Sequence, residues 1–244
     1  MNRLDREIRT SDRLREQTER MQEEWIANIT HDLKTPLSPI RGYAELMQEP
    51  DSAKQEQYGH YARIILKNTS YMEALIDDLK LTYQLKNGMI PMKKEEQNLV
   101  RFLRELVIDI LNTPEYEQRR ILFTCTRETI LFSFDPTLLT RAFRNLILNA
   151  FLHGESDTEA ALHICQEGTV IQITVSDNGK GIPEKDQENL FRRYYRGTGT
   201  DEKTEGTGLG LAIVKNIVSL HKGTISVSSI PGTGTAFHIR FPLS

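Results

Sequence analysis

The chain has 244 residues, of which 31 are Lys or Arg and 34 are Asp or Glu, so its formal net charge at pH 7 is −3. That length allows two domains, and the charge balance lacks the basic excess of a nucleic-acid-binding protein, so no nucleic-acid partner is predicted. No stretch of about 18 apolar residues occurs, which predicts that the chain itself does not span a membrane and is soluble.

The first 48 residues are predicted to be helical. Apolar or weakly polar residues recur there at intervals of three and four with Arg and Glu between them, which is typical of a coiled-coil seam. These residues are Leu4, Ile8, Ser11, Leu14, Thr18, Met21 and Trp25. Because Ser11 and Thr18 weaken the seam, a solvated charged helix is the alternative. We interpret residues 1–20 as an N-terminal signal-relay coiled-coil helix.

A second helix is predicted after a break. Glu49-Pro50-Asp51-Ser52 interrupts the first helix, and apolar residues then keep helical spacing from Gln55 to Gln84. Two long helices around a short turn form an antiparallel hairpin. One hairpin cannot bury both apolar stripes, so two chains are predicted to pair as a four-helix bundle. Residues 21–88 then form a dimerisation and phosphotransfer domain, and a linker follows over residues 89–97.

The remaining residues, 98–244, have the pattern of a mixed α/β domain. Helical segments alternate with short runs of period-two alternation, such as Ile171-Gln172-Ile173-Thr174-Val175. Helices are predicted over 99–111, 137–152 and 212–221, and strands over 120–125, 171–175, 224–229 and 236–241. The predicted fold class is α+β with two domains, a helical hairpin that forms a dimeric four-helix bundle and then an α/β sandwich.

The string His31-Asp32-Leu33-Lys34-Thr35-Pro36-Leu37 lies in the first predicted helix. Asp32 can accept a hydrogen bond from one imidazole nitrogen of His31, which fixes the tautomer and leaves the other nitrogen free to attack phosphorus. Thr35 lies one turn further on and shares the face of His31. Pro36 has no N–H for the carbonyl of Asp32, which predicts a bend immediately behind the histidine.

Three later segments have the composition of a nucleotide pocket. Asn145 and Asn149 are four residues apart on a predicted helix, so both amides share one face. Asp177 continues the inward parity of its strand, and a buried unpaired carboxylate calls for a ligand or ordered water. It begins Asp177-Asn178-Gly179-Lys180-Gly181, and the third segment, Gly206-Thr207-Gly208-Leu209-Gly210, precedes a helix whose N–H groups favour phosphate.

In their order and in their residues, these four motifs resemble those of bacterial two-component sensor histidine kinases, over roughly residues 20–244. The resemblance implies that His31 is the phosphoacceptor, that Asp32 assists it, and that Thr35 orients water to dephosphorylate a partner. It also implies that Asn149 binds Mg²⁺ and that Asp177 accepts a hydrogen bond from the adenine amino group. The other implied nucleotide-binding residues are Asn145, His153, Gly179, Gly181, Arg193, Arg196, Gly206, Thr207, Gly208, Leu209 and Gly210.

The resemblance also predicts the activity and its setting. The chain would be a protein-histidine kinase that autophosphorylates His31 from Mg-ATP and passes the phosphoryl group to an aspartate of a response-regulator receiver domain. It would also dephosphorylate that regulator, act as a homodimer, and close a mobile lid over residues 190–205. The parent protein would lie at the cytoplasmic face of the bacterial inner membrane, held through segments absent from this chain.

One position departs from the family pattern. Members often carry Lys or Arg and then Tyr or His after the second asparagine motif, whereas this chain has Leu152 and then His153, so a cation on the phosphate side is missing. Two alternatives stay open. The first is a non-catalytic dimeric phosphotransfer or docking adaptor, which Leu152 favours. The second is an ATPase of the gyrase, chaperone and mismatch-repair fold, which needs a water-activating glutamate that residues 138–152 lack.

Overall fold

The computed structural model describes residues 26–27, 29–48, 55–154, 157–192, 195 and 208–243. The chain divides into two compact units, residues 1–77 and residues 78–244. The predicted coiled coil of residues 1–20 and the predicted break at residues 49–52 lie outside the described residues. None of the described helices is both long enough and apolar enough to cross a membrane.

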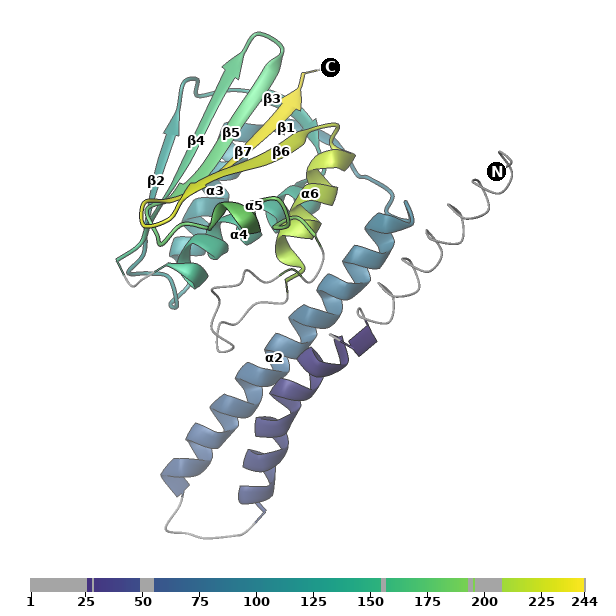
Figure 1. Ribbon diagram of the computed structural model, residues 1–244, viewed down its shortest axis with the longest axis vertical. Helices are drawn as coiled ribbons and strands as arrows, with labels where there is room; N and C mark the ends of the chain where they lie inside the picture. The colour runs from purple at the N-terminus through teal and green to yellow at the C-terminus, as the bar shows by residue number, and fades with distance from the viewer. Residues whose placement is uncertain are drawn as a thin grey trace, which may run out of the picture. The chain divides into compact units, whose positions relative to one another are not determined.

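The first unit contains the two helices that the sequence predicts. Residues 29–46 are helical, and α2 runs over Gln55–Lys86, into the second unit. Within the first unit the two helices lie side by side (Figure 1), and the rings of Tyr43 and Tyr61 meet with their centroids 5.0 Å apart. The predicted hairpin is therefore confirmed. Leu37, Leu46 and Leu66 remain exposed on it.

The second unit contains a five-stranded mixed sheet in the order β2-β4-β5-β7-β6. The β2–β4 pair is parallel and the other pairs are antiparallel, while β1 and β3 form a separate two-stranded sheet. The elements are β1 (Glu95–Asn98), α3 (Leu99–Leu111), β2 (Arg120–Cys125), β3 (Leu131–Phe134), α4 (Pro136–His153), β4 (Glu159–Glu167), β5 (Val170–Asp177), α5 (Glu184–Gln187), α6 (Gly210–Leu220), β6 (Thr224–Ile230) and β7 (Gly234–Pro242).

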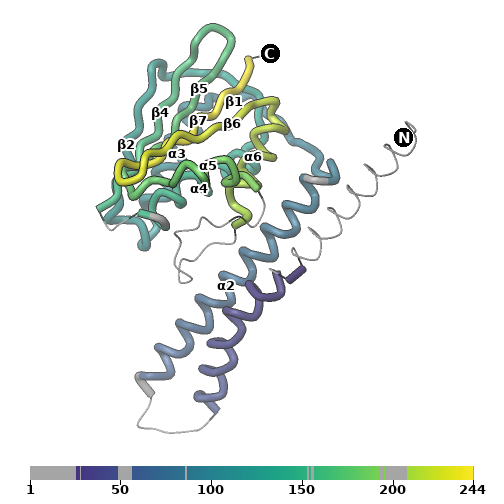
Figure 2. Tube along the Cα trace, viewed as in Figure 1, coloured from purple at the N-terminus to yellow at the C-terminus, as the bar shows by residue number. Residues whose placement is uncertain are grey.

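The core lies between this sheet and the helices α3, α4 and α6, which gather on one of its faces (Figures 1 and 2). Alternate residues of β5 and β7, among them Ile173, Val175 and Ile239, are buried under the helices, and the residues between them are more exposed. This is the alternation expected of a sheet with one covered face. The predicted α/β sandwich, and with it the two-domain α+β fold class, is confirmed.

Side-chain caps fix where two of the helices begin. The carbonyl oxygen of the Asn98 side chain accepts hydrogen bonds from the backbone N–H groups of Val100 and Arg101 at the start of α3. Asp135 does the same for Leu138 at the start of α4, where Pro136 takes a position that needs no N–H. The helices predicted over 99–111 and 137–152 therefore match α3 and α4 closely.

Four elements were not predicted from the sequence. Residues 95–98, at the end of the predicted linker, instead form β1, which pairs with the equally unpredicted β3. Both strands have only four residues, too few for a period-two pattern to stand out. β4 carries the small or polar residues Ala161, His163 and Cys165 on its outer face, and α5 is a single turn.

His221 anchors the end of α6 inside this unit. Its side chain is 3% exposed, its Nδ1 donates to the carbonyl of Ile217 at 2.8 Å, and its Nε2 accepts from the backbone N–H of Asp135 at 3.0 Å. Both ring nitrogens are satisfied only when the imidazole is neutral, because Nε2 must accept. Burial lowers the pKa of His221, and the positive charge of Lys94 adds to this effect.

We expect the second unit to lose stability in mild acid through His221. Because the pKa in the folded state lies below that of the unfolded chain, the neutral imidazole contributes its full stability above about pH 6.5, and this contribution is lost as pH falls. Because the unfolded chain binds up to one proton more than the folded chain, the free energy of unfolding falls by up to about 1.4 kcal/mol per pH unit. Urea unfolding between about pH 8 and about pH 5.5 measures it.

His221→Leu is expected to be less stable throughout but to have a flatter pH profile. The exposed His163 supplies the matched control, because His163→Gln should keep the wild-type slope. A slope unchanged in His221→Leu would contradict the assignment.

Candidate functional site

His31 presents its imidazole to solvent on the helix of residues 29–46. The side chain is 78% exposed, whereas that of Asp32 is 11% exposed. The Nδ1 atom of His31 lies 3.5 Å from a carboxylate oxygen of Asp32, at the outer limit of a hydrogen bond. Among the described residues, none hydrogen-bonds to Nε2. The arrangement leaves Nε2 as the nitrogen that can react with a ligand.

Thr35 lies on the same stretch of helix. Its hydroxyl donates to the backbone carbonyl of His31 at 3.1 Å and is otherwise exposed. Thr30, five residues earlier, makes the same kind of bond to the carbonyl of Ile26 at 2.8 Å. The described helix continues through Pro36, which is buried.

The two asparagines of the predicted pocket lie on α4. The residues between and beside them, Leu146, Ile147 and Ala150, are buried in the core, as predicted. Asn145 donates from its amide nitrogen to the carbonyl of Gly210 at 3.4 Å, so the asparagine helix and the start of α6 meet. Within the described part of the chain, the amide of Asn149 has no hydrogen-bond partner and is available to a ligand.

Asp177 ends β5 and is the titratable group of the pocket. One carboxylate oxygen accepts from the backbone N–H of Gly179 at 2.9 Å, and the backbone N–H of Thr235 also donates to the carboxylate. Burial raises the pKa of Asp177, and these two hydrogen bonds oppose that rise. No ion pair to it exists among the described residues, and its protein partners there are backbone N–H donors. Such a carboxylate favours a ligand that brings a further donor.

The glycines after Asp177 are required by their own loop. A Cβ on Gly179 would lie 2.9 Å from a carboxylate oxygen of Asp177. Gly181 has a φ of 68°, and its Cβ would lie 2.2 Å from the carbonyl oxygen of Ile230. The family resemblance counts Gly181 among the nucleotide-binding residues, but the backbone of Ile230 fills the space beside it. Its role in the structure is to let the loop pack against β6.

The third motif is described only in part. Gly208 has a φ of 64°, and Gly210 opens α6. Leu209 is fully buried, so its side chain serves the core and only its backbone can face a ligand. Gly206, Thr207, Arg193 and Arg196, the side chain of His153 and most of the predicted lid lie outside the described residues. Leu152 is 41% exposed on α4.

Two residues that were not predicted from the sequence bring α4 and the Asp177 loop together. A Cβ on Gly154 would lie 2.3 Å from the hydroxyl of Thr158, which is 4% exposed. A Cβ on Gly179 would lie 3.6 Å from the Cα of Gly154 and 3.7 Å from the methyl of Thr158. A glycine immediately after the asparagine helix was the available signal. The sequence did not predict β4, which begins at Glu159, so Thr158 could not be identified as the residue that packs against Gly154.

These residues fit a nucleotide and a magnesium ion. The partly buried carboxylate of Asp177 can accept a hydrogen bond from a ligand. The amide of Asn149 is not hydrogen-bonded to any described residue. Among the described residues, no group of three or more His, Cys, Asp or Glu side chains could hold a metal. The amide oxygen of Asn149 is a ligand type that Mg²⁺ accepts together with phosphates and waters.

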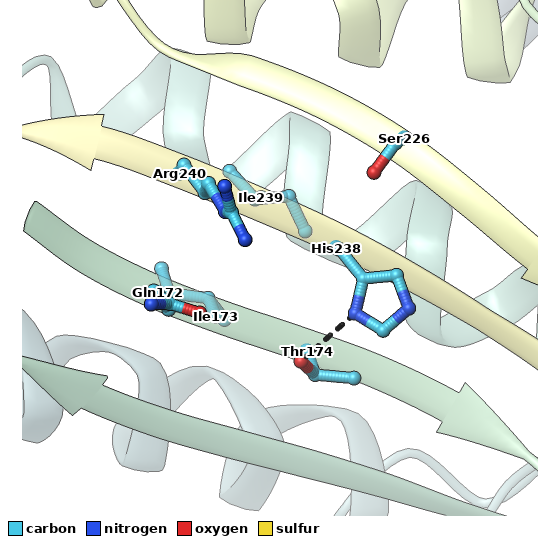
Figure 3. A pocket seen from close by; sticks show the side chains of 7 residues that line it. All are labelled: Gln172, Ile173, Thr174, Ser226, His238, Ile239 and Arg240. Atoms are coloured by element: carbon cyan, nitrogen blue, oxygen red, sulfur yellow. Dashed lines mark hydrogen bonds between the residues drawn. The ribbon is translucent and has the colours of Figure 1, made fainter.

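The uncovered face of the sheet carries a separate hollow of about 240 Å³ (Figure 3). Gln172, Thr174, Ser226, His238 and Arg240 line it, and Nδ1 of His238 lies 3.3 Å from the hydroxyl of Thr174. None of the described residues of the predicted site lines this hollow. It is smaller than the roughly 300–1,000 Å³ of typical ligand pockets, so it is not the nucleotide site.

Comparison with protein families gives two matches. Residues 134–244 match the family of histidine kinase-, DNA gyrase B- and HSP90-like ATPases, and residues 21–88 match the His kinase A phosphoacceptor domain. The chain is 39% identical over 242 residues to the sensor histidine kinase YvrG of Bacillus subtilis, and 32% identical over 232 residues to the sensor protein kinase WalK of Staphylococcus aureus. These alignments cover 99% and 93% of this chain but 42% and 55% of the relatives, so the chain spans about half their length.

Solved structures share the fold. The histidine kinase ThkA, crystallised with the response regulator TrrA, aligns with a TM-score of 0.70 at 21% identity, over 98% of this chain and 67% of that one. The histidine kinase AdeS of Acinetobacter baumannii aligns with a TM-score of 0.67 at 20% identity, over 88% of this chain and 98% of its own. With both family domains matched in their order along the sequence, the chain belongs to the sensor histidine kinases.

Proposed function

We propose that the chain is the kinase core of a sensor histidine kinase. His31 takes the terminal phosphoryl group of Mg-ATP bound by the second unit and passes it to an aspartate of a response-regulator receiver domain. The observation that carries the proposal is the exposed imidazole of His31, whose Nδ1 faces Asp32 while no described residue occupies Nε2. The neutral ring attacks through the Nε2 lone pair, and Asp32 stabilises the positive charge that develops on the ring.

The residues of the second unit would hold the nucleotide by different groups. Asp177 accepts from the adenine amino group, Asn149 offers its amide oxygen to Mg²⁺, and Asn145 fixes the start of α6 near the phosphates. Mg²⁺ supplies neutralisation of the phosphate charge. Leu152 contributes no charge there, so Lys180 and the arginines that follow α5 in the sequence are the candidates for that task.

The partners follow from the same assignment. The helical hairpin supports a homodimer in which two hairpins form a four-helix bundle, because one hairpin alone leaves large apolar side chains such as Leu66 exposed. A response regulator is the proposed phosphoryl acceptor, in line with ThkA, which was solved with the response regulator TrrA. Location at the cytoplasmic face of a bacterial membrane stays a prediction from the family resemblance.

Incubation of the purified chain with γ-labelled ATP tests the proposal. A kinase acquires a label that acid releases and base does not, because a phosphoramidate forms on histidine. Steady release of free phosphate with no labelled protein would instead identify an ATPase. Absence of both label and nucleotide binding would identify the docking adaptor.

Thr35→Ala is expected to separate two activities. The hydroxyl of Thr35 is exposed and bonds to a backbone carbonyl, not to the imidazole, so autophosphorylation of His31 should stay within about twofold of wild type. Dephosphorylation of the partner regulator should fall by about tenfold or more, since positioning of water is lost. Both rates are measured with the same labelled preparation.

Thr30→Ala is the matched control, because it removes a hydroxyl bonded to a helix carbonyl in the same way. Equal losses of both activities in Thr35→Ala would reject the separate role.

A further inference from the structure

We propose that Ser229 and Gln187 form a lock that sets the position of the Asp177 loop, residues 177–183, and thereby the affinity and base selectivity for ATP. The inference rests on the proposed function, and it assigns positioning roles to two residues that contact no substrate. Neither belongs to the sequence motifs. They lie on β6 and α5, which face each other across the end of this loop.

The hydroxyl of Ser229 makes all the hydrogen bonds that it can make. It accepts from the backbone N–H of Ile182 at 2.7 Å and donates to the carbonyl of Gly234 at 2.8 Å. The hydroxyl of Thr235 lies 3.0 Å away. Because the single proton of Ser229 goes to Gly234, Thr235 must donate in that pair. One side chain thus joins the end of the loop to the first two residues of β7.

Gln187 holds the same point from the other side. Its amide nitrogen donates one N–H to the carbonyl of Ile182 and the other to the carbonyl of Ser229, both at 2.9 Å. Ile182 therefore has its N–H bound by Ser229 and its carbonyl bound by Gln187. With both backbone groups of this residue fixed, the loop cannot shift along β6 without breaking at least one hydrogen bond.

The lock leads directly to Asp177. Thr235, whose hydroxyl contacts Ser229, is the register partner of Asp177 in the β5–β7 pair, and its backbone N–H is a donor to the Asp177 carboxylate. Between these two ends, the backbone N–H of Gly232 donates to the carbonyl of Lys180 at 2.8 Å, and Gly181 packs on Ile230. The base-reading carboxylate and the end of its loop are thus held on one β6–β7 hairpin. A positional error at Ile182 would be transmitted to Asp177.

The full chain tests the lock through Ser229→Ala and Gln187→Met. Each variant leaves polar groups of Ile182 without a partner while keeping volume close to wild type. Each should raise the Kd for Mg-ATP by about five- to tenfold, because the loop that carries Asp177 is no longer held in one position. The rate of His31 labelling at saturating ATP should stay near wild type, and the preference for ATP over GTP should decrease.

Ser228→Ala is the matched control, because the hydroxyl of Ser228 faces the other side of β6 and contacts Nε2 of His238 at 2.9 Å. The double variant Ser229→Ala/Gln187→Met should be less than additive, since both residues hold Ile182. Unchanged Kd and base preference in both single variants, with wild-type labelling intact, would overturn the lock. A wild-type chain that binds no ATP would instead overturn the proposed function.

Discussion

Replacing His31 by Gln is expected to reduce incorporation of label from γ-labelled ATP to background. Glutamine has no basic nitrogen lone pair, so no phosphoramidate can form at this position. Stability should change by less than about 0.5 kcal/mol, because the imidazole is 78% exposed and glutamine has good helix propensity. ATP binding by the second unit should be unaffected. Acid-labile label and nucleotide affinity are measured on the same preparation.

His60→Gln is the matched control for this experiment. His60 is also an exposed histidine of the helical unit, on α2, and its loss should leave labelling at the wild-type level. Label that persists in His31→Gln would place the phosphoacceptor elsewhere and remove the basis of the proposed function. Loss of nucleotide binding together with label would point to a folding defect instead.

Local signals made most of the second unit predictable, namely the helices α3, α4 and α6 and the strands β2, β5, β6 and β7. Asn98 and Asp135 cap α3 and α4 next to strongly periodic apolar residues, and both helix bounds were predicted within one residue of the observed ones. The helical spacing of apolar residues along α2 is also a local signal. The bounds of β1 and β3 depend on each other, because neither four-residue strand forms a sheet without its partner.

The residues of the site likewise fall into those with a local sequence signal and those without one. Asn145, Asn149 and Asp177 were found from spacing and strand parity, which one segment of sequence contains. Other residues act only through contacts between segments far apart in the chain, and nothing in their own neighbourhood distinguishes them; these are Gly154, Thr158, Ser229 and Gln187. Gly181 shows the intermediate case. Its position in a motif was visible, but its physical role depended on where Ile230 lies.

Asp177→Asn is expected to weaken ATP binding by about 100-fold while leaving the fold as stable as wild type or more so. In the wild type both backbone N–H donors, from Gly179 and Thr235, point at the carboxylate. A carboxamide that keeps its oxygen on the N–H of Gly179 turns its NH₂ group toward the adenine amino group. Two donors would then meet where the wild type has a donor and an acceptor.

Stability should move in the opposite direction from affinity. Burial raises the pKa of Asp177, so ionisation costs the folded state free energy above that pKa, and a neutral amide removes the cost. Titration of a fluorescent ATP analogue and thermal unfolding at neutral pH measure the two effects. Asp109→Asn, an exposed substitution on α3, is the control and should change neither. If the variant loses both Tm and ATP affinity, Asp177 serves folding. Direct recognition of the base predicts a loss of affinity without a loss of Tm.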